Sequence, residues 1–346
     1  MNENSLVSTK PVLLTGITGY IGSRIAVDLL NRGYAVRGTM RNAAKRDKIV
    51  PAIAEHAPTD KLEVISANLL DASSWTAAAQ GCECVMHVAS PIAAIEPDDP
   101  QAMIDEARNG ALHVLAAATE AGVRRVVMTS SMAAIGYGLD GTPASPMTET
   151  RWTDPAHPDN TTYVRSKTIA ERAAWDFVRD TPGAPELVTV NPGAVLGPLL
   201  TTSLSDSHLI VTKMLKGEFP GVPKFGFELV DVRDVSDLHI KALEHHEAAG
   251  ERYLAVAGLR DMMDIKEVLA KAAPTYKSKL PKFKLPDFVV RLFAKFDKET
   301  AGVLNELGRR RIASSQKART QLGWQPRSPE EAIEATAADV IRLGLV

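Results

Sequence analysis

The order of apolar runs between residues 11 and 192 constrains the fold more than any other feature of this sequence. Short runs rich in β-branched residues alternate with longer amphipathic segments, which is the pattern of parallel strands joined by helices. Strands are expected near residues 12–16, 35–40, 62–66, 84–89, 125–130 and 186–191. Helices are expected near residues 20–32, 43–56, 73–79, 101–121 and 163–179. The sequence therefore predicts an α/β protein with a Rossmann-type, doubly wound parallel sheet, which binds ligands at the carboxyl ends of its strands.

The regular alternation fails after about residue 192, where loop-rich, proline-rich and basic stretches occupy about 198–226 and 274–287. Residues 287–296 carry one apolar stripe, which indicates a core or lid helix rather than a helix on a membrane surface. Its members are Phe288, Val289, Leu292, Phe293 and Phe296. Arg309, Arg310 and Arg311 have no aromatic residue among them, so we expect a solvated face there rather than a nucleic-acid site.

The charge balance excludes two classes of partner. The chain has 40 basic and 42 acidic residues and a formal charge of −2, so no overall field favours a nucleic-acid backbone or an anionic membrane. The first eleven residues are polar, and the apolar stretch after them is broken by Gly16, Gly19 and Gly22. Neither a signal peptide nor a membrane span is expected, which makes the cytoplasm the expected location.

The two cysteines, Cys82 and Cys84, are one residue apart. Joining two cysteines that are separated by a single residue needs a strained loop, so no disulfide is expected. With His87 nearby, a metal site would still need two more ligands, and we expect no metal.

A glycine motif follows the first expected strand. The residues from Thr15 to Gly22 read Thr-Gly-Ile-Thr-Gly-Tyr-Ile-Gly, and a helix is expected to open at about Tyr20. Gly16 permits a tight turn, Gly19 lets a pyrophosphate approach the main chain at a helix N-terminus, and Gly22 lets helix and strand pack closely. The position of the motif predicts a dinucleotide site made by Thr15, Gly16, Thr18, Gly19, Tyr20, Ile21 and Gly22.

The end of the second expected strand indicates which dinucleotide binds. An NAD-preferring site places an acidic residue there, but residues 37–42 contain none. Arg41 instead offers a planar fork for a 2′-phosphate, with Arg37, Lys45 or Arg46 within reach. The cofactor expected from these residues is NADP(H).

Tyr163 and Lys167 lie four residues apart, so they share one face of a helix. A phenol must act as a general acid near pH 7 although its free pKa is about 10, and a nearby ammonium group lowers that pKa by stabilising phenolate. A serine of the run Thr129-Ser130-Ser131, at the end of the fifth expected strand, can hydrogen-bond the reacting oxygen. The combination predicts hydride transfer to a carbonyl group.

These motifs resemble those of the extended short-chain dehydrogenase/reductases, and the likeness covers nearly the whole chain. Within that family, several segments look like the group of dihydroflavonol 4-reductase, cinnamoyl-CoA reductase and yeast methylglyoxal (aldehyde) reductase. These segments are residues 36–41, 87–91, 129–131, 149–152 and 163–167. The resemblance implies that Ser131 polarises the carbonyl, that Tyr163 donates the proton and that Lys167 holds the nicotinamide ribose.

The same resemblance implies further cofactor contacts. Arg41 would bind the 2′-phosphate, and Asn68 and Leu69 would lie beside adenine, although the family usually has Asp where this chain has Asn68. The remaining contacts with the ribose and the nicotinamide would come from Val88, Ala89, Ser90, Pro192, Gly193 and Val195. We expect residues 1–192 with about 227–258 to form the NADP-binding domain, and about 193–226 with 259–346 to form a smaller, irregular substrate-binding domain.

The resemblance narrows the substrate only by elimination. Dihydroflavonol reductases carry a polar residue, typically asparagine, where Gly136 is the counterpart, and the cinnamoyl-CoA reductase signature around the tyrosine is replaced by Asn160-Thr161-Thr162-Tyr163. Reduction of aldehydes and ketones is the expectation that remains. A sugar-nucleotide epimerase or dehydratase with NAD, and a non-catalytic NADP-sensing module, are the alternatives. Helices near 101–121 and 163–179 could pair subunits, so both a monomer and a homodimer stay open.

Overall fold

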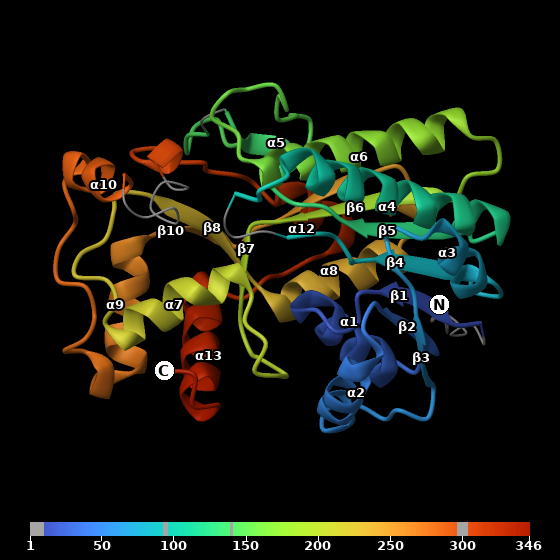
Figure 1. The fold of residues 1–346 in the computed structure, drawn as a ribbon, viewed down its shortest axis with the longest axis horizontal. Helices are drawn as coiled ribbons and strands as arrows, with labels where there is room; N and C mark the ends of the chain where they lie inside the picture. The colour runs from blue at the N-terminus through green and yellow to red at the C-terminus, as the bar shows by residue number, and fades with distance from the viewer. Residues whose placement is uncertain (1–9, 93–95, 139–140, 296–303) are drawn as a thin grey trace.

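The computed structural model describes residues 10–92, 96–138, 141–295 and 304–346, and its centre is a seven-stranded parallel sheet (Figure 1). The strand order is β3-β2-β1-β4-β5-β6-β9. The bounds are β1 Val12–Thr15, β2 Val36–Met40, β3 Leu62–Ser66, β4 Cys84–His87, β5 Arg125–Thr129, β6 Glu186–Pro192 and β9 Arg252–Ala255. The order changes direction between β1 and β4, as it does in a doubly wound sheet. The predicted fold class is confirmed, and all six expected strands are present.

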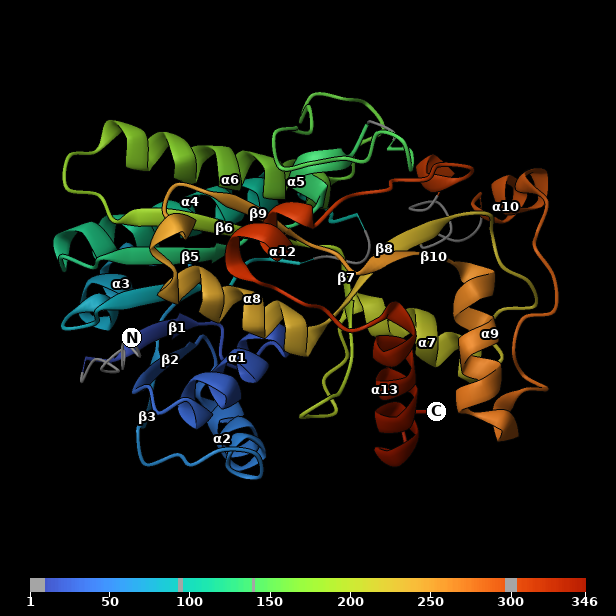
Figure 2. The same ribbon diagram turned by 180° about the vertical axis from the view of Figure 1, so that it is seen from behind.

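Helices cover both faces of this sheet (Figures 1 and 2). One face packs against α1 Tyr20–Asn31, α2 Arg46–Ala54 and α8 Val232–Glu244, and the other against α3 Ala72–Ala79, α4 Pro100–Glu120 and α6 Thr162–Asp180. In β1, Val12 and Leu14 enter the first core, whereas Leu13 enters the second. A strand buried on both faces is apolar throughout, which explains the continuous runs in the sequence. The expected helix near 43–56 begins with a 3₁₀ turn, η1 Ala43–Lys45.

A second, three-stranded sheet lies beyond the carboxyl ends of the main strands. Its order is β10-β8-β7, with β7 Ala194–Leu196, β8 Gly226–Asp231 and β10 Gly258–Asp261. It packs against α7 Asp206–Lys216, α9 Met262–Ala272 and α13 Pro329–Arg342. Short 3₁₀ turns connect this region: η2 His246–Ala248, η3 Pro274–Tyr276 and η4 Leu304–Glu306.

This second region is more regular than its composition suggests, because α7 lies inside the stretch 198–226 that we expected to be mainly loop. The backbone N–H of Ser205 donates to Nδ1 of His208 (3.0 Å), which closes the first turn of α7. Gly217, at φ 82°, ends the helix in the left-handed conformation. Both signals were present in the sequence but were hidden among the prolines and loop residues around them.

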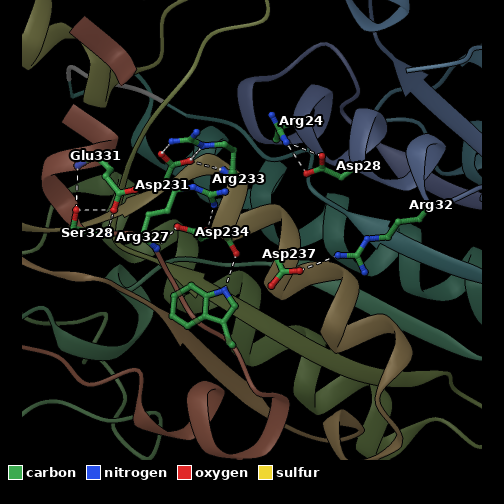
Figure 3. A network of polar contacts seen from close by, with 11 residues as sticks. Arg24, Asp28, Arg32, Asp231, Arg233, Asp234, Asp237, Arg327, Ser328 and Glu331 are labelled. Carbon is green, nitrogen blue, oxygen red and sulfur yellow. Dashed lines mark hydrogen bonds and ion pairs between the residues drawn. The ribbon is translucent and has the colours of Figure 1, made fainter. Parts of the chain in front are cut away.

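The C-terminal segment returns to the main sheet through a tryptophan anchor. After α12 Gln316–Leu322, Trp324 is 1% exposed and its indole N–H donates to the backbone oxygen of Asp234 (2.9 Å). Arg327 forms an ion pair with the Asp234 carboxylate, and its backbone N–H donates to the same group (2.7 Å). Figure 3 shows these contacts beside the ion pair of Arg233 with Asp231. The segment before α13 is therefore fixed to the first turn of α8.

The structure narrows one expectation for the C-terminal region, that of a core or lid helix over residues 287–296, and corrects another. Helix α10 Asp287–Phe293 forms as predicted, but Phe288, Leu292 and Phe293 are 72%, 54% and 55% exposed. Most of the stripe is therefore not core, and Phe296 lies outside the described residues. Arg311 is buried and not on a solvated face, because its guanidinium lies 4.1 Å from the ring centre of Tyr137 and forms an ion pair with Glu306. Nothing among the helices that the structure describes is both long and apolar enough to cross a membrane.

The tryptophan anchor gives the first prediction. Replacing Trp324 with Ala removes a large buried side chain and leaves the Asp234 carbonyl without its donor, so the free energy of unfolding should fall by about 3–5 kcal/mol. Urea denaturation followed by circular dichroism measures this change. The matched control is Phe288→Ala, an exposed aromatic side chain, which should stay within about 0.5 kcal/mol of the wild type. A loss for Trp324→Ala no larger than that of the control would contradict the anchor.

Candidate active site

The carboxyl ends of β1, β2, β4, β5 and β6 open into one cavity of about 2200 Å³. One end of the cavity is lined by the glycine motif and Arg41, and the other by α7 and by residues from the C-terminal region. This is the location expected for a ligand site in an open parallel sheet. The predicted site residues can therefore be placed against a single cavity.

The glycine motif forms the turn that its spacing predicted. Gly16 has a φ of +71° and lies against the backbone of Ala89, where an added Cβ would approach to 3.1 Å. A Cβ on Gly22 would lie only 2.2 Å from the carbonyl oxygen of Gly16, so strand and helix approach each other closely here. Helix α1 begins after Gly19 with no side-chain cap. Its first backbone N–H groups are thus available to an anion in the cavity.

Thr15 was predicted to contact the cofactor, but it is not among the residues that line the cavity. Its hydroxyl accepts hydrogen bonds from the backbone N–H groups of Val88 and Ala89, both at 2.9 Å. The hydroxyl proton is then left for Nδ1 of His87 (3.0 Å), an imidazole whose burial lowers its pKa to about 3. Thr15 therefore joins β1 to the end of β4 and orients the segment from Val88 to Ser90, which does line the cavity.

Of the basic residues predicted near the 2′-phosphate of the cofactor, some line the cavity and others do not. Arg41 lines the cavity with its side chain 76% exposed, and its nearest acidic group is Glu106 at 3.9 Å. Lys45, in η1, lines the same end. Arg37 does not, because it points away and is held by Glu63 (2.6 Å) and by the carbonyl oxygens of two residues near the end of α3. Arg46 is also absent from the lining.

The other predicted contact residues all line the cavity. They are Thr18, Tyr20, Ile21, Asn68, Leu69, Val88, Ala89, Ser90, Pro192, Gly193 and Val195. Asn68 uses its side-chain oxygen to accept from the backbone N–H of Leu70 (3.2 Å), and its backbone oxygen accepts from Trp75 (2.9 Å). The Asn68–Leu69 segment is therefore held in place by α3.

The three predicted catalytic residues meet at one point of the cavity. Thr161 caps α6 by accepting from the backbone N–H of Val164, and Tyr163 and Lys167 then follow one helical turn apart. The Lys167 ammonium lies 5.8 Å from the ring centre of Tyr163. Ser131 follows β5 at the start of α5 Ala133–Gly136, and its hydroxyl lies close enough to Tyr163 to lower the pKa of the phenol. The sequence left open which serine faces the tyrosine, and the structure places Ser131 there.

The surrounding protein shifts the pKa values of Tyr163 and Lys167 in directions that the sequence did not predict. Burial raises the pKa of Tyr163, against a lowering by the hydrogen bond from Ser131 and with a further raising by the charge of Asp206. Burial lowers the pKa of Lys167 to about 8, and the Glu171 carboxylate opposes that shift. We expected Lys167 to lower the pKa of Tyr163, and the net shift has the opposite sign. Loss of hydration is the largest cause of the raised pKa of Tyr163, and Lys167 is not among the groups that shift it.

Gly136, the counterpart of the polar residue of dihydroflavonol reductases, does not face the cavity. It is buried and absent from the cavity lining, and a Cβ at this position would lie 2.4 Å from the sulfur of Met147. The next residue, Tyr137, lines the cavity instead and is backed by Arg311. A polar side chain at position 136 would therefore need Met147 to move before it could reach a substrate.

Sequence reasoning missed three groups around the catalytic residues. Asp206, at the start of α7, lines the cavity, and its charge raises the pKa of Tyr163. Tyr137 also lines the cavity. Glu171, one turn beyond Lys167, is fully buried and bonded to Arg252 (2.7 Å). Its spacing was a usable signal, because positions 163, 167 and 171 lie on one face of a helix.

Comparison with known proteins shows which family this chain resembles. Residues 12–256 match the model of the NAD dependent epimerase/dehydratase family. Cinnamoyl-CoA reductase 1 of Petunia hybrida is 38% identical over 272 residues, which cover 78% of this chain and 79% of the relative. Tetraketide alpha-pyrone reductase 2 of Arabidopsis thaliana is 32% identical over 271 residues, covering 76% and 83%.

Among solved structures, Gre2 from Candida albicans in complex with NADPH has a TM-score of 0.79 at 26% identity and covers 96% of this chain and 99% of its own. This likeness extends through the second sheet and the C-terminal region as well as the main sheet. Together, the match over residues 12–256, the glycine turn and the Tyr163–Lys167 pair show that the chain belongs to the NAD dependent epimerase/dehydratase family, the extended short-chain dehydrogenase/reductases.

Proposed function

We propose that this protein reduces an aldehyde or ketone to the alcohol with NADPH. The observation that carries the proposal is the meeting of Ser131, Tyr163 and Lys167 in the cavity that also contains the glycine turn and Arg41. The two reductases reported above, each more than 30% identical over three quarters of this chain, support the same reaction class.

The residues of the other end of the cavity fit NADPH. The uncapped start of α1 and the turn at Gly16 suit a pyrophosphate, and the fork of Arg41 with Lys45 suits a 2′-phosphate. The dinucleotide in the Candida albicans structure, NADPH, agrees with this choice. When bound, NADPH supplies the hydride that the carbonyl carbon accepts.

Tyr163 then acts as the general acid toward the carbonyl oxygen. Because burial raises its pKa, the phenol is protonated at neutral pH and is in the form that can donate. The hydroxyl of Ser131 hydrogen-bonds the carbonyl oxygen as negative charge develops on it. Lys167, with a pKa of about 8, is mainly an ammonium ion at pH 7 and stabilises the phenolate left after proton transfer.

The substrate end of the cavity favours a neutral carbonyl compound with an apolar portion. Apolar side chains dominate this end, and they are Met132, Phe225, Phe227, Met262, Leu285, Val290 and Phe293. The Asp206 carboxyl group also lines this end and disfavours an anionic substrate, whereas burial raises the pKa of Glu228 to about 7 and leaves that carboxyl group only partly charged at neutral pH. The proposed substrates are therefore uncharged aldehydes and ketones.

Replacement of Tyr163 tests the reaction. Tyr163→Phe removes only the proton donor, so kcat should fall by about 10²- to 10⁴-fold, while the Kd for NADPH should change by less than about threefold. NADPH oxidation with a panel of aldehydes, ketones, α-keto esters and diketones measures kcat, and NADPH fluorescence measures Kd. Tyr276→Phe, outside the cavity, serves as the matched control.

Two outcomes would count against the reaction. Wild-type protein that oxidises no NADPH with any member of the panel contradicts carbonyl reduction. Purified protein that carries stoichiometric NAD instead would support the epimerase alternative.

Replacement of Arg41 tests the cofactor. Arg41→Ala should raise the KM for NADPH by about 10- to 100-fold, because a charge-assisted contact with the 2′-phosphate is lost, and should leave the KM for NADH nearly unchanged. Steady-state rates with both cofactors, measured side by side, give the ratio. Arg46→Ala removes an exposed arginine five residues away that does not line the cavity, and should leave the ratio unchanged. An unaltered NADPH preference in Arg41→Ala would refute the assignment.

A further inference from the structure

We propose that Glu171 is a positioning residue that keeps Lys167 charged and holds Ser131 in place, and that Arg252 and residues 149–152 fix Glu171 for this task. The proposal rests on the function proposed above. It also gives a role to residues 149–152, which the resemblance highlighted and the reaction itself does not use.

The Glu171 carboxylate is buried and fully hydrogen-bonded. One oxygen accepts from Nε of Arg252 (2.7 Å), the hydroxyl of Thr189 (3.0 Å) and the indole of Trp175 (3.3 Å). The other accepts from the hydroxyl of Ser130 (2.5 Å) and the amide of Asn191 (2.7 Å). These five donors satisfy both oxygens of a carboxyl group that is out of contact with water.

Two of these donors connect Glu171 to Ser131. Ser130 precedes Ser131 in the chain, and the side-chain amide of Asn191 donates to the backbone oxygen of Ser131 (3.1 Å) as well as to Glu171. The backbone N–H groups on either side of Ser131 bind β6, from Ser130 to Val190 (2.8 Å) and from Met132 to Pro192 (2.9 Å). The main chain of Ser131 is thus fixed from both sides. Its hydroxyl oxygen accepts from the backbone N–H of Ala133 (3.1 Å), and the hydroxyl proton remains for Tyr163.

Arg252 is held in turn by the segment 149–152. One guanidinium nitrogen donates to the backbone oxygens of Glu149 (2.7 Å) and Arg151 (2.8 Å). The guanidinium lies over the indole of Trp152 at 3.7 Å. The Glu149 carboxylate accepts from the backbone N–H of Leu254 (2.9 Å), which ties the segment to β9. These contacts hold the Arg252 guanidinium beside the Glu171 carboxylate.

The charges around Lys167 show why the carboxylate matters. The titratable groups that act on the ammonium are Tyr163 and Glu171 on its own helix and His87 on β4. His87 is neutral at working pH, because burial lowers its pKa to about 3. Glu171 is the group that raises the pKa of Lys167 against the effect of burial. Arg252 offsets part of that negative charge, so removing Glu171 and removing Arg252 must act on Lys167 in opposite directions.

The opposite effects of Glu171 and Arg252 on the pKa of Lys167 can be tested with two variants. Glu171→Gln should lower the pH at which Lys167 loses its proton by about one unit, and Arg252→Gln should raise it. The first readout is the high-pH limb of kcat, measured from pH 6 to 10 with the best substrate of the panel. The second needs neither substrate nor cofactor. It is the pH dependence of labelling of Lys167 by an amine-reactive reagent, followed by mass spectrometry, with a wild-type midpoint at about 8.

A matched control comes from the same sheet. Glu186 also pairs with a buried arginine, Arg125 (2.7 Å), but at the opposite ends of β5 and β6. Glu186→Gln should therefore destabilise the protein without moving either pH profile. Thermal unfolding of all three variants, followed by circular dichroism, separates loss of stability from the shift in proton affinity.

The outcomes are distinct. Shifts of opposite sign in the two variants support the proposal, whereas unchanged midpoints or shifts in one common direction overturn it and leave Glu171 a structural residue. If Glu171→Gln does not fold, Arg252→Gln decides alone, by an upward shift or by none. If the wild type reduces no carbonyl compound, the proposed function fails, but the labelling midpoints still decide whether Glu171 sets the charge of Lys167.

Discussion

The active-site geometry depends on one buried ammonium ion. Lys167 is 5% exposed at the end of a sheet whose two faces are both covered, where loss of hydration disfavours its charge. The nearest compensation is Glu171, which lies deeper and is itself compensated by Arg252. The alternation of charge, from lysine to glutamate to arginine, extends from the cavity to β9 and ends on an aromatic face. The buried ammonium ion of Lys167 is thus the first of a series of alternating charges that continues behind the cavity.

The carboxyl ends of the main strands position the residues in both halves of the cavity. Thr15 bridges β1 and β4 below the glycine turn, while Asn191 bridges β6 and the serine segment after β5. Each bridge uses a side chain to satisfy backbone groups where the ladder of the sheet stops, and each orients a segment that lines the cavity. The substrate end is assembled differently, from α7, α10 and residues near Arg311, which are distant in sequence. The anchor at Trp324 ties the chain that follows these elements to α8.

The parts of the molecule that the sequence predicted are those in which one local rule decides the outcome. Strands buried on both faces read as apolar runs, and Gly16 and Gly22 stand where the backbone leaves no room for a side chain. Motif and strand order together predicted that Tyr163, Lys167 and Ser131 lie close together, and the structure brings all three to one cavity. The predictions were wrong where a contact with a residue distant in sequence determines the position of a side chain. Arg37 turns toward Glu63, and Arg311 is buried over Tyr137. No periodicity or motif in the sequence signals those contacts.

The acidities of the tyrosine and lysine also set a preferred state for the pair. Because the pKa of Tyr163 is raised and that of Lys167 is lowered to about 8, a phenol and an ammonium ion coexist below pH 8, which is the combination that can give a proton to a carbonyl oxygen. Oxidation of an alcohol needs the reverse, a phenolate that accepts a proton, and the raised pKa of Tyr163 makes that form scarce at neutral pH. Above pH 8 the lysine loses its charge before the phenol does, so the phenolate then forms without its stabilising neighbour. The protein groups therefore leave the pair as a phenol and an ammonium ion at neutral pH, and burial is the largest cause of both pKa shifts.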